Sequence, residues 1–140
     1  MSDPLTYQQV FTFFQAQNGA VNELWKFYSA VALALLAAAV GSDKLKATKL
    51  GIGMVLGGFW LFSIANLVAL VNTQSVVVDL ANSLNALAPN DPSSAAIVFT
   101  PTPSWGIAIF HLVCDISLTI AIYVVAHNAW TQKPAHTEVG

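Results

Sequence analysis

The stretch LGIGMVLGGFWLFSIANLVALV, residues 50–71, decides the class of fold. It runs for 22 residues without one Asp, Glu, Lys, Arg or His. About 20 predominantly apolar residues form a helix long enough to cross the hydrocarbon core of a bilayer, whereas buried helices of water-soluble domains are shorter apolar runs. We therefore predict a transmembrane helix over residues 50–71.

Two further stretches flank this segment and are nearly as apolar. Residues 21–41 contain Glu23 and Lys26 near one end, and residues 105–127 contain His111 and Asp115 in their interior. Both are long enough to cross a bilayer. We therefore predict three transmembrane helices in an all-α integral membrane protein with a single membrane domain.

The composition of the whole chain agrees with this class. Of its 140 residues, 56% are hydrophobic and only 9% are charged, whereas about 25% are charged in a typical soluble domain. The chain has five lysines, no arginine and a net charge of −2. A nucleic-acid partner would need a basic face, so we expect the lipid bilayer as a partner and no nucleic acid.

The segment before the first span has the pattern of an amphipathic helix. Ser2 and Pro4 are typical of a helix start, and Asn18 with Gly19 is typical of a helix end. Apolar residues recur between them at helical spacing, which predicts an interfacial helix over residues 1–19. Because this segment lacks a basic polar face, we expect the helix to pack against the bundle. These residues are Tyr7, Val10, Phe11 and Phe14.

A long loop, residues 72–104, follows the second span. It contains a second apolar stripe, which predicts a short amphipathic helix over residues 76–88. Residues 89–92 (PNDP) are typical of a helix end, and residues 95–100 resemble a short β-like stretch. The stripe consists of Val77, Leu80, Leu84 and Leu87.

The lysines predict the orientation of the chain. The short loop between the first two spans carries Lys44, Lys46 and Lys49, and the tail, residues 128–140, carries Lys133. The long loop carries none, and Lys26 alone opposes the pattern. The positive-inside rule places the lysine-rich side in the cytoplasm. We therefore expect a multi-pass protein of a cell membrane, of the bacterial inner-membrane type, with the N-terminus outside and the C-terminus cytoplasmic.

Two lines of small residues predict close helix packing. Helices in lipid associate through small side chains that let backbones approach. These lines indicate contacts within the chain or between copies, although glycine and alanine are common in membrane helices anyway. One line contains Gly53, Gly57 and Ala65, with Leu61 and Ala69 at the same spacing, and the other contains Ala30, Ala34 and Ala38.

The third span carries a polar residue at every fourth position. Residues four apart lie nearly above one another on a helix, with a drift of about 40° per step at 3.6 residues per turn. The other positions of this span are largely apolar, so one polar stripe winds slowly around the helix. The stripe consists of His111, Asp115, Thr119, Tyr123 and His127.

Asp115 is the most demanding residue of this stripe. A charged aspartate at the centre of a bilayer costs roughly 2.5–3.5 kcal/mol on insertion scales, so such residues face protein or water and have a partner. His111 lies one turn away, and Thr119 can donate a hydrogen bond from the other side. Candidate partners across the bundle on the second span are Ser63, Asn66 and Asn72.

Three functions are compatible with these patterns. The leading hypothesis is a non-catalytic subunit that assembles by helix packing into a homo- or hetero-oligomer. The alternative is an oligomeric channel for ions or protons, lined by the polar stripe. The third is a membrane enzyme that uses His111 and Asp115 as an acid–base pair. Because no nucleophile, phosphate-loop or metal-helix motif occurs, we expect no enzyme activity, no cofactor and no metal.

Overall fold

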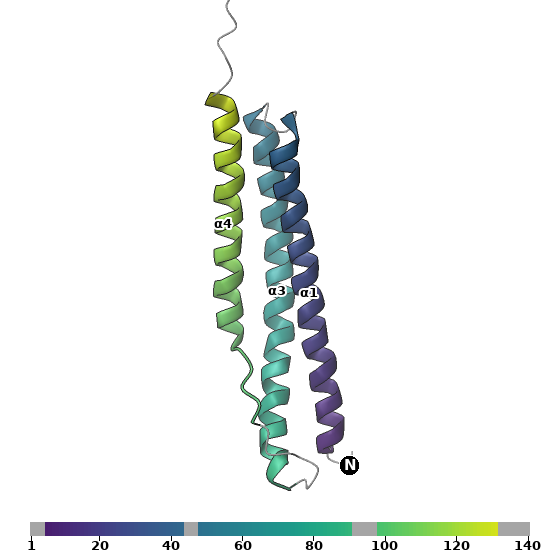
Figure 1. Cartoon of the computed structure of the whole chain (residues 1–140). Helices are drawn as coiled ribbons and strands as arrows, with labels where there is room; N and C mark the ends of the chain where they lie inside the picture. The colour runs from purple at the N-terminus through teal and green to yellow at the C-terminus, as the bar shows by residue number, and fades with distance from the viewer. Residues whose placement is uncertain (1–4, 44–47, 91–97, 132–140) are drawn as a thin grey trace, which may run out of the picture.

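The computed structural model describes residues 5–43, 48–90 and 98–131. Within these ranges the chain forms three long helices, α1 (Tyr7–Gly41), α3 (Lys49–Leu87) and α4 (Ser104–Thr131), with a short 3-10 turn, η1 (Ala88–Asn90), after α3. The helices run up, down and up side by side (Figure 1). Each is long and apolar enough to cross a membrane, which confirms the all-helical fold class and the number of candidate spans.

Helices α1 and α3 are longer than a bilayer requires. They contain 35 and 39 residues, which correspond to about 52 and 58 Å at 1.5 Å per residue, whereas the hydrocarbon core is about 30 Å thick. Their surplus lies on the side of the bundle where α4 has not yet begun (Figure 1). We call this two-helix extension, residues 7–20 of α1 and 72–87 of α3, the stalk.

The prediction of a separate interfacial helix over residues 1–19 is wrong. Helix α1 continues through Asn18 and Gly19 without a break, and no glycine in the described ranges has the positive φ that a glycine helix end adopts. The helix begins at Tyr7, where Thr6 and Gln9 form a reciprocal capping box. The start expected at residues 2–4 lies outside the described residues. The apolar stripe of this segment packs on protein rather than lying alone on a lipid surface.

The prediction of a separate helix over residues 76–88 is also wrong. Residues 76–87 are the last turns of α3, and residue 88 begins η1. The polar residues that suggested a loop after residue 71 remain helical. Thr73 Oγ1 donates to the carbonyl oxygen of Ala69 at 2.8 Å, and Ser75 Oγ donates to that of Asn72 at 2.7 Å. Their hydroxyls are therefore satisfied within the helix, and the second stripe faces the first across the stalk.

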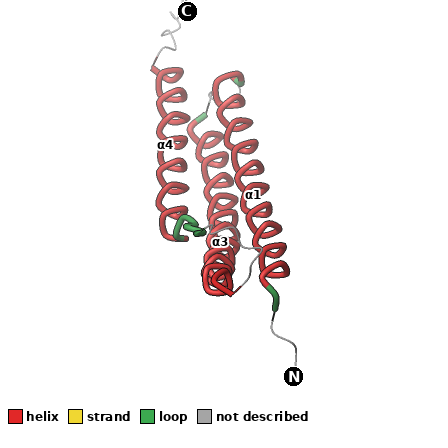
Figure 2. The backbone as a smooth tube through the Cα atoms, turned by 60° about the horizontal axis from the view of Figure 1, so that its bottom comes forward, coloured by secondary structure: helices red, strands yellow, loops and turns green. Residues whose placement is uncertain are grey.

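An extended segment, residues 98–103, leads from the stalk to α4, and we call it the strap. The side-chain amide of Asn85 pairs with the backbone of Phe99 through two hydrogen bonds of 2.9 Å. The ring of Phe99 packs edge-on against Phe14, with ring centres 5.1 Å apart. Residues 98–100 have no regular secondary structure, so the β-like stretch is not seen there, and residues 95–97 lie outside the described ranges. Figure 2 shows the strap as the loop that enters α4.

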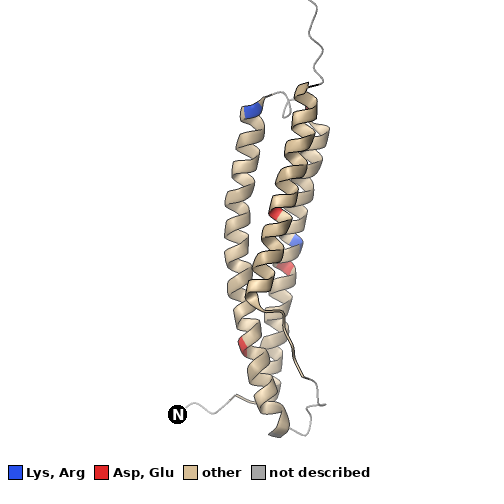
Figure 3. Ribbon diagram, turned by 90° about the vertical axis from the view of Figure 1, so that its left-hand side faces the viewer, with Lys and Arg blue, Asp and Glu red and all other residues tan. Residues whose placement is uncertain are grey.

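Two hydrophobic clusters fill the bundle. One lies where the stalk joins the three-helix part, and the other lies toward the opposite end. The outer surface is also apolar, with Leu61 74% exposed, as expected of a surface in contact with lipid. Charged residues are few along the helices (Figure 3). The buried members of the clusters are Val21, Leu70, Val77 and Ile107 in the first, and Ala39, Ile52, Ile122 and Ala126 in the second.

Candidate functional site: a buried polar cluster

Polar side chains from all three helices meet between the two hydrophobic clusters. Five side chains make up this group, and none of them is more than 6% exposed. Since α1, α3 and α4 each contribute, the group ties the whole three-helix part together. We call it the polar cluster; it consists of Tyr28 on α1, Ser63 and Asn66 on α3, and His111 and Asp115 on α4.

The carboxylate of Asp115 is the centre of the polar cluster. The hydroxyl of Tyr28 donates to its Oδ1 at 2.8 Å, and the hydroxyl of Ser63 donates to its Oδ2 at 2.5 Å. The ring nitrogen Nδ1 of His111 lies 3.0 Å from the same Oδ2. An ionised carboxylate is an acceptor only. Three converging donors therefore supply the partners that a charged aspartate needs in a dry interior.

The second ring nitrogen of His111 also has a partner. The amide nitrogen of Asn66 lies 3.3 Å from His111 Nε2. With the amide N–H donating there, Nε2 accepts, and the ring proton resides on Nδ1, where it points at Asp115. The imidazole also contacts two aromatic rings, with Tyr28 4.3 Å and Trp25 5.5 Å from it between ring centres. Both ring nitrogens of His111 and the side of the ring that meets Tyr28 and Trp25 are therefore engaged.

The polar cluster is closed. In the described part of the chain, no buried side-chain nitrogen or oxygen lacks a hydrogen-bond partner. Toward the stalk the cluster is followed by the first hydrophobic cluster, with Trp25 packed against it. Toward the other end it is followed by the second, with Leu56 and Leu118 packed against it. The polar atoms are therefore satisfied by one another and shielded on both sides.

The polar stripe of the third span does not stay on one face of the bundle. His111 and Asp115 are buried, and Thr119 is half-buried and donates to the backbone carbonyl of Asp115 at 2.8 Å. Tyr123 is 52% exposed and His127 is exposed as well. Four steps of about 40° rotate the stripe by roughly 160° between its first and last residue, so the last two residues point away from the core.

Two expected cross-helix partners lie in the polar cluster, and the third does not. Ser63 contacts Asp115, and Asn66 contacts His111. Asn72 is exposed at the end of the stalk that joins the three-helix part. Tyr28 was not expected from the sequence. Its signal is a hydroxyl in the interior of an apolar span, which in lipid needs a partner just as a carboxylate does.

The two small-residue lines face outward. A methyl group added at Gly53 or Gly57 would meet no heavy atom of its surroundings within 4 Å. Helix contacts along these lines are therefore not made within the chain, and the surface is open to lipid or to another protein. Ala30, Ala34, Ala38, Leu61 and Ala65 are exposed too, and Ala69 at the end of its line is half-buried.

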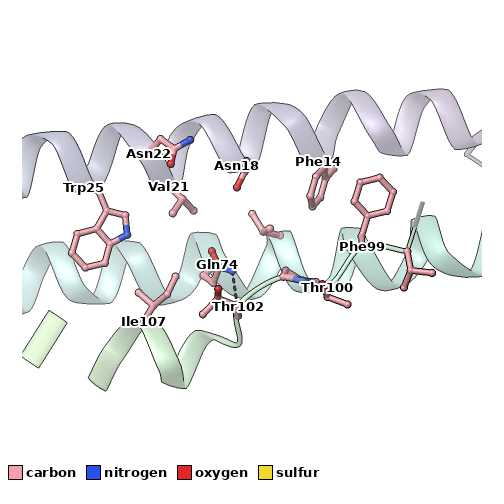
Figure 4. Close-up of a pocket in the computed structure, with 13 residues that line it drawn as sticks. Phe14, Asn18, Val21, Asn22, Trp25, Gln74, Phe99, Thr100, Thr102 and Ile107 are labelled. Atoms are coloured by element: carbon pink, nitrogen blue, oxygen red, sulfur yellow. Dashed lines mark hydrogen bonds between the residues drawn. The ribbon is translucent and has the colours of Figure 1, made fainter. Parts of the chain in front are cut away.

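A cavity of about 460 Å³ lies on the stalk side of the polar cluster (Figure 4). It opens between α1, α3 and the strap, and amide side chains of Asn18, Asn22 and Gln74 line it. Gln74 Nε2 donates to the carbonyl oxygen of Thr102 at 2.6 Å and so fastens the strap. Trp25 also lines the cavity and contacts His111, so its indole separates the cavity from the polar cluster.

The polar cluster does not have the ligands of a metal centre. Among the residues that the structure describes, no group of three His, Cys, Asp or Glu side chains could hold a metal ion. Comparison of the chain with protein-family models, with curated proteins and with solved structures finds no match. The chemistry that the arrangement supports is the pairing of one buried carboxyl group with three polar side chains.

Proposed function

We propose that this chain is a non-catalytic, multi-pass membrane protein that serves as a subunit of a larger membrane assembly. The closed polar cluster is the observation that carries this proposal. A catalytic or conducting group must meet substrate or water, whereas the polar atoms of Asp115 and His111 are engaged with neighbouring side chains. Such an arrangement favours a structural role over a catalytic one.

The role of the polar cluster follows from its energetics. Moving a charged aspartate to the bilayer centre costs roughly 2.5–3.5 kcal/mol, and interhelical hydrogen bonds in membranes average only about 0.6 kcal/mol each. Three such bonds recover about 1.8 kcal/mol, roughly half to three quarters of this cost. Any other sliding or rotation of the helices would leave Asp115 unpaired. The polar cluster thus selects one register of the three helices rather than adding much net stability.

The outward small-residue lines support assembly with other membrane helices. The polar cluster already shelters Asp115 within one chain, so a partner is not needed for that purpose. The open surface at Gly53 and Gly57 instead supplies the close backbone approach on which helix pairs in lipid depend. We therefore place the contact with a second copy or with another membrane subunit on this face of α3.

Replacing Gly57 by leucine is expected to dissociate the assembly without disturbing the fold, because a Cβ atom added at Gly57 meets nothing within 4 Å and the position is exposed. Native mass measurement after mild detergent extraction should show a complex for the wild type and a single chain for Gly57→Leu. Ser117→Leu is the control, since Ser117 is exposed on α4 and should leave the complex intact. A wild-type protein that is extracted as a lone chain would contradict the proposal.

We propose further that the N-terminus lies outside the cell and the C-terminus in the cytoplasm, as the lysines indicate. The two ends of the described chain lie at opposite ends of the bundle (Figures 1 and 2). In the background of Cys114→Ala, the variant Leu5→Cys should react with an impermeant maleimide on intact cells. A cysteine at position 131 should react only after lysis. The reverse pattern would invert the orientation.

Conduction along α4 is the competing function. One observation favours it, because the stalk-side cavity reaches Trp25, which contacts His111. The other side of the polar cluster opposes it, since the side chains buried together there, Ala39, Ile52 and Ile122, are apolar. We therefore favour the structural role.

A further inference from the structure

A second cavity lies at the end of the bundle opposite the stalk. It measures about 380 Å³ and lies between the first turns of α3 and the last turns of α4. We call it the interfacial pocket, because both helices end there. It is lined by Lys49, Ile52, Gly53, Leu56, Tyr123, His127 and Trp130.

The electrostatic character of the interfacial pocket is positive. Lys49 is the charged residue of its lining, and its Nζ lies 5.8 Å from the ring centre of Trp130. His127 adds a ring N–H that can donate a hydrogen bond. Among the residues that the structure describes, no aspartate or glutamate lines the pocket. The pocket therefore attracts an anion.

The rim of the interfacial pocket carries aromatic rings with polar tips. Tyr123 packs against His127 with ring centres 5.9 Å apart and against Trp130 at 6.4 Å. Tyrosine and tryptophan side chains gather at the level of lipid headgroups, where one end of the ring is wet and the other apolar. The rim thus fits the boundary between water and hydrocarbon.

The floor of the interfacial pocket is apolar and continues along α3. Ile52 and Leu56 line it, and the space beside Gly53 is open. A ligand that matches both parts has an anionic head and a long apolar tail.

We propose that the interfacial pocket binds the phosphate headgroup of an anionic phospholipid, with Lys49 and His127 at the phosphate and an acyl chain over the floor at Ile52 and Leu56. Basic pockets between transmembrane helices bind such headgroups on the cytoplasmic side. The N-terminus of α3 adds partial positive charge. The opposing carbonyls at the end of α4 are partly occupied, because Thr131 Oγ1 donates to those of His127 and Asn128.

The test uses the delipidated full chain in detergent and native mass spectrometry with phosphatidylglycerol or phosphatidylcholine. We expect the wild type to bind phosphatidylglycerol at least tenfold more tightly than the Lys49→Gln variant does. Lys26→Gln is the matched control, because Lys26 is exposed and pairs with Glu23 at 2.6 Å, so this variant should bind like the wild type. His127→Leu should also bind more weakly, because it removes the ring N–H.

Each other outcome overturns the proposal. Equal affinity of wild type and Lys49→Gln for phosphatidylglycerol would show that the interfacial pocket is not the site. Equal retention of phosphatidylcholine would show that the charge of the headgroup is not recognised. If millimolar inorganic phosphate displaced phosphatidylglycerol completely, the ligand would be a free phosphate rather than a lipid. None of these outcomes depends on whether the chain assembles with others.

Discussion

Replacing Asp115 by leucine is expected to destabilise the folded bundle by about 3 kcal/mol or more. The substitution leaves the hydroxyls of Tyr28 and Ser63 and the Nδ1 proton of His111 without their acceptor in a dry core. Each buried donor left unsatisfied costs about 1–3 kcal/mol. The measurement is the free energy of unfolding in mixed micelles, followed by loss of helix signal or by steric trapping.

Three further variants separate the polar cluster from a general effect of substitution. Tyr28→Phe removes one donor and should lose only about 0.6 kcal/mol, the average for interhelical hydrogen bonds. Ser117→Ala, on the exposed face of the same helix, should change the stability by less than about 0.5 kcal/mol. The double replacement of His111 and Asp115 by leucine should be less destabilising than the sum of the single ones, because an apolar pair leaves fewer orphaned groups. If Asp115→Leu were no worse than Tyr28→Phe, the five residues would not act as a unit.

A substitution of Asp115 also distinguishes the structural role from conduction. In liposomes with a proton gradient, the wild type and Asp115→Asn are both expected to show the flux of protein-free vesicles, because the polar cluster is shielded by apolar side chains on both sides. A flux that the wild type carries and Asp115→Asn abolishes would replace the proposed function by its alternative.

The sequence predicted the membrane class and the three apolar helices because hydrophobicity and length are local properties. It could also indicate that Asp115 needs a partner, since the insertion cost depends on residue type and depth. It could not show how far the polar stripe would remain buried. The direction of the stripe relative to the core depends on how α4 rotates against its neighbours, and the 160° turn between His111 and His127 spreads it over two faces.

The two wrong predictions about the fold, the separate helices over residues 1–19 and 76–88, have a common physical cause. The periodicity at Tyr7 to Phe14 and at Val77 to Leu87 correctly marks apolar faces, but periodicity does not say what covers a face. A bilayer surface and a second helix have the same pattern. The choice rests on tertiary contacts such as the pairing of Asn85 with Phe99. The helix end expected at Gly19 failed for a related reason: glycine disfavours a helix interior by only about 1 kcal/mol, which packing on either side outweighs.

The second large effect is expected in the stalk. Val77 is 2% exposed and packs in the first hydrophobic cluster with Val21 and Phe14 of α1, whereas its neighbour Val76 is 43% exposed. Val77→Asp places an unpaired carboxylate among apolar side chains, which should cost about 3 kcal/mol of local stability. Val76→Asp makes the same chemical change on the exposed face of the same turn. Its stability should lie within about 0.5 kcal/mol of that of the wild type.

Hydrogen exchange decides between a stalk and two separate surface helices. If residues 7–20 and 72–87 support each other, Val77→Asp accelerates exchange in both segments, because opening one side removes the partner of the other. If each segment instead lay alone on the bilayer surface, the same substitution would release only residues 72–87, and residues 7–20 would stay protected. The response of α1 to a change in α3 is therefore the discriminating signal, and Val76→Asp should leave both segments unchanged.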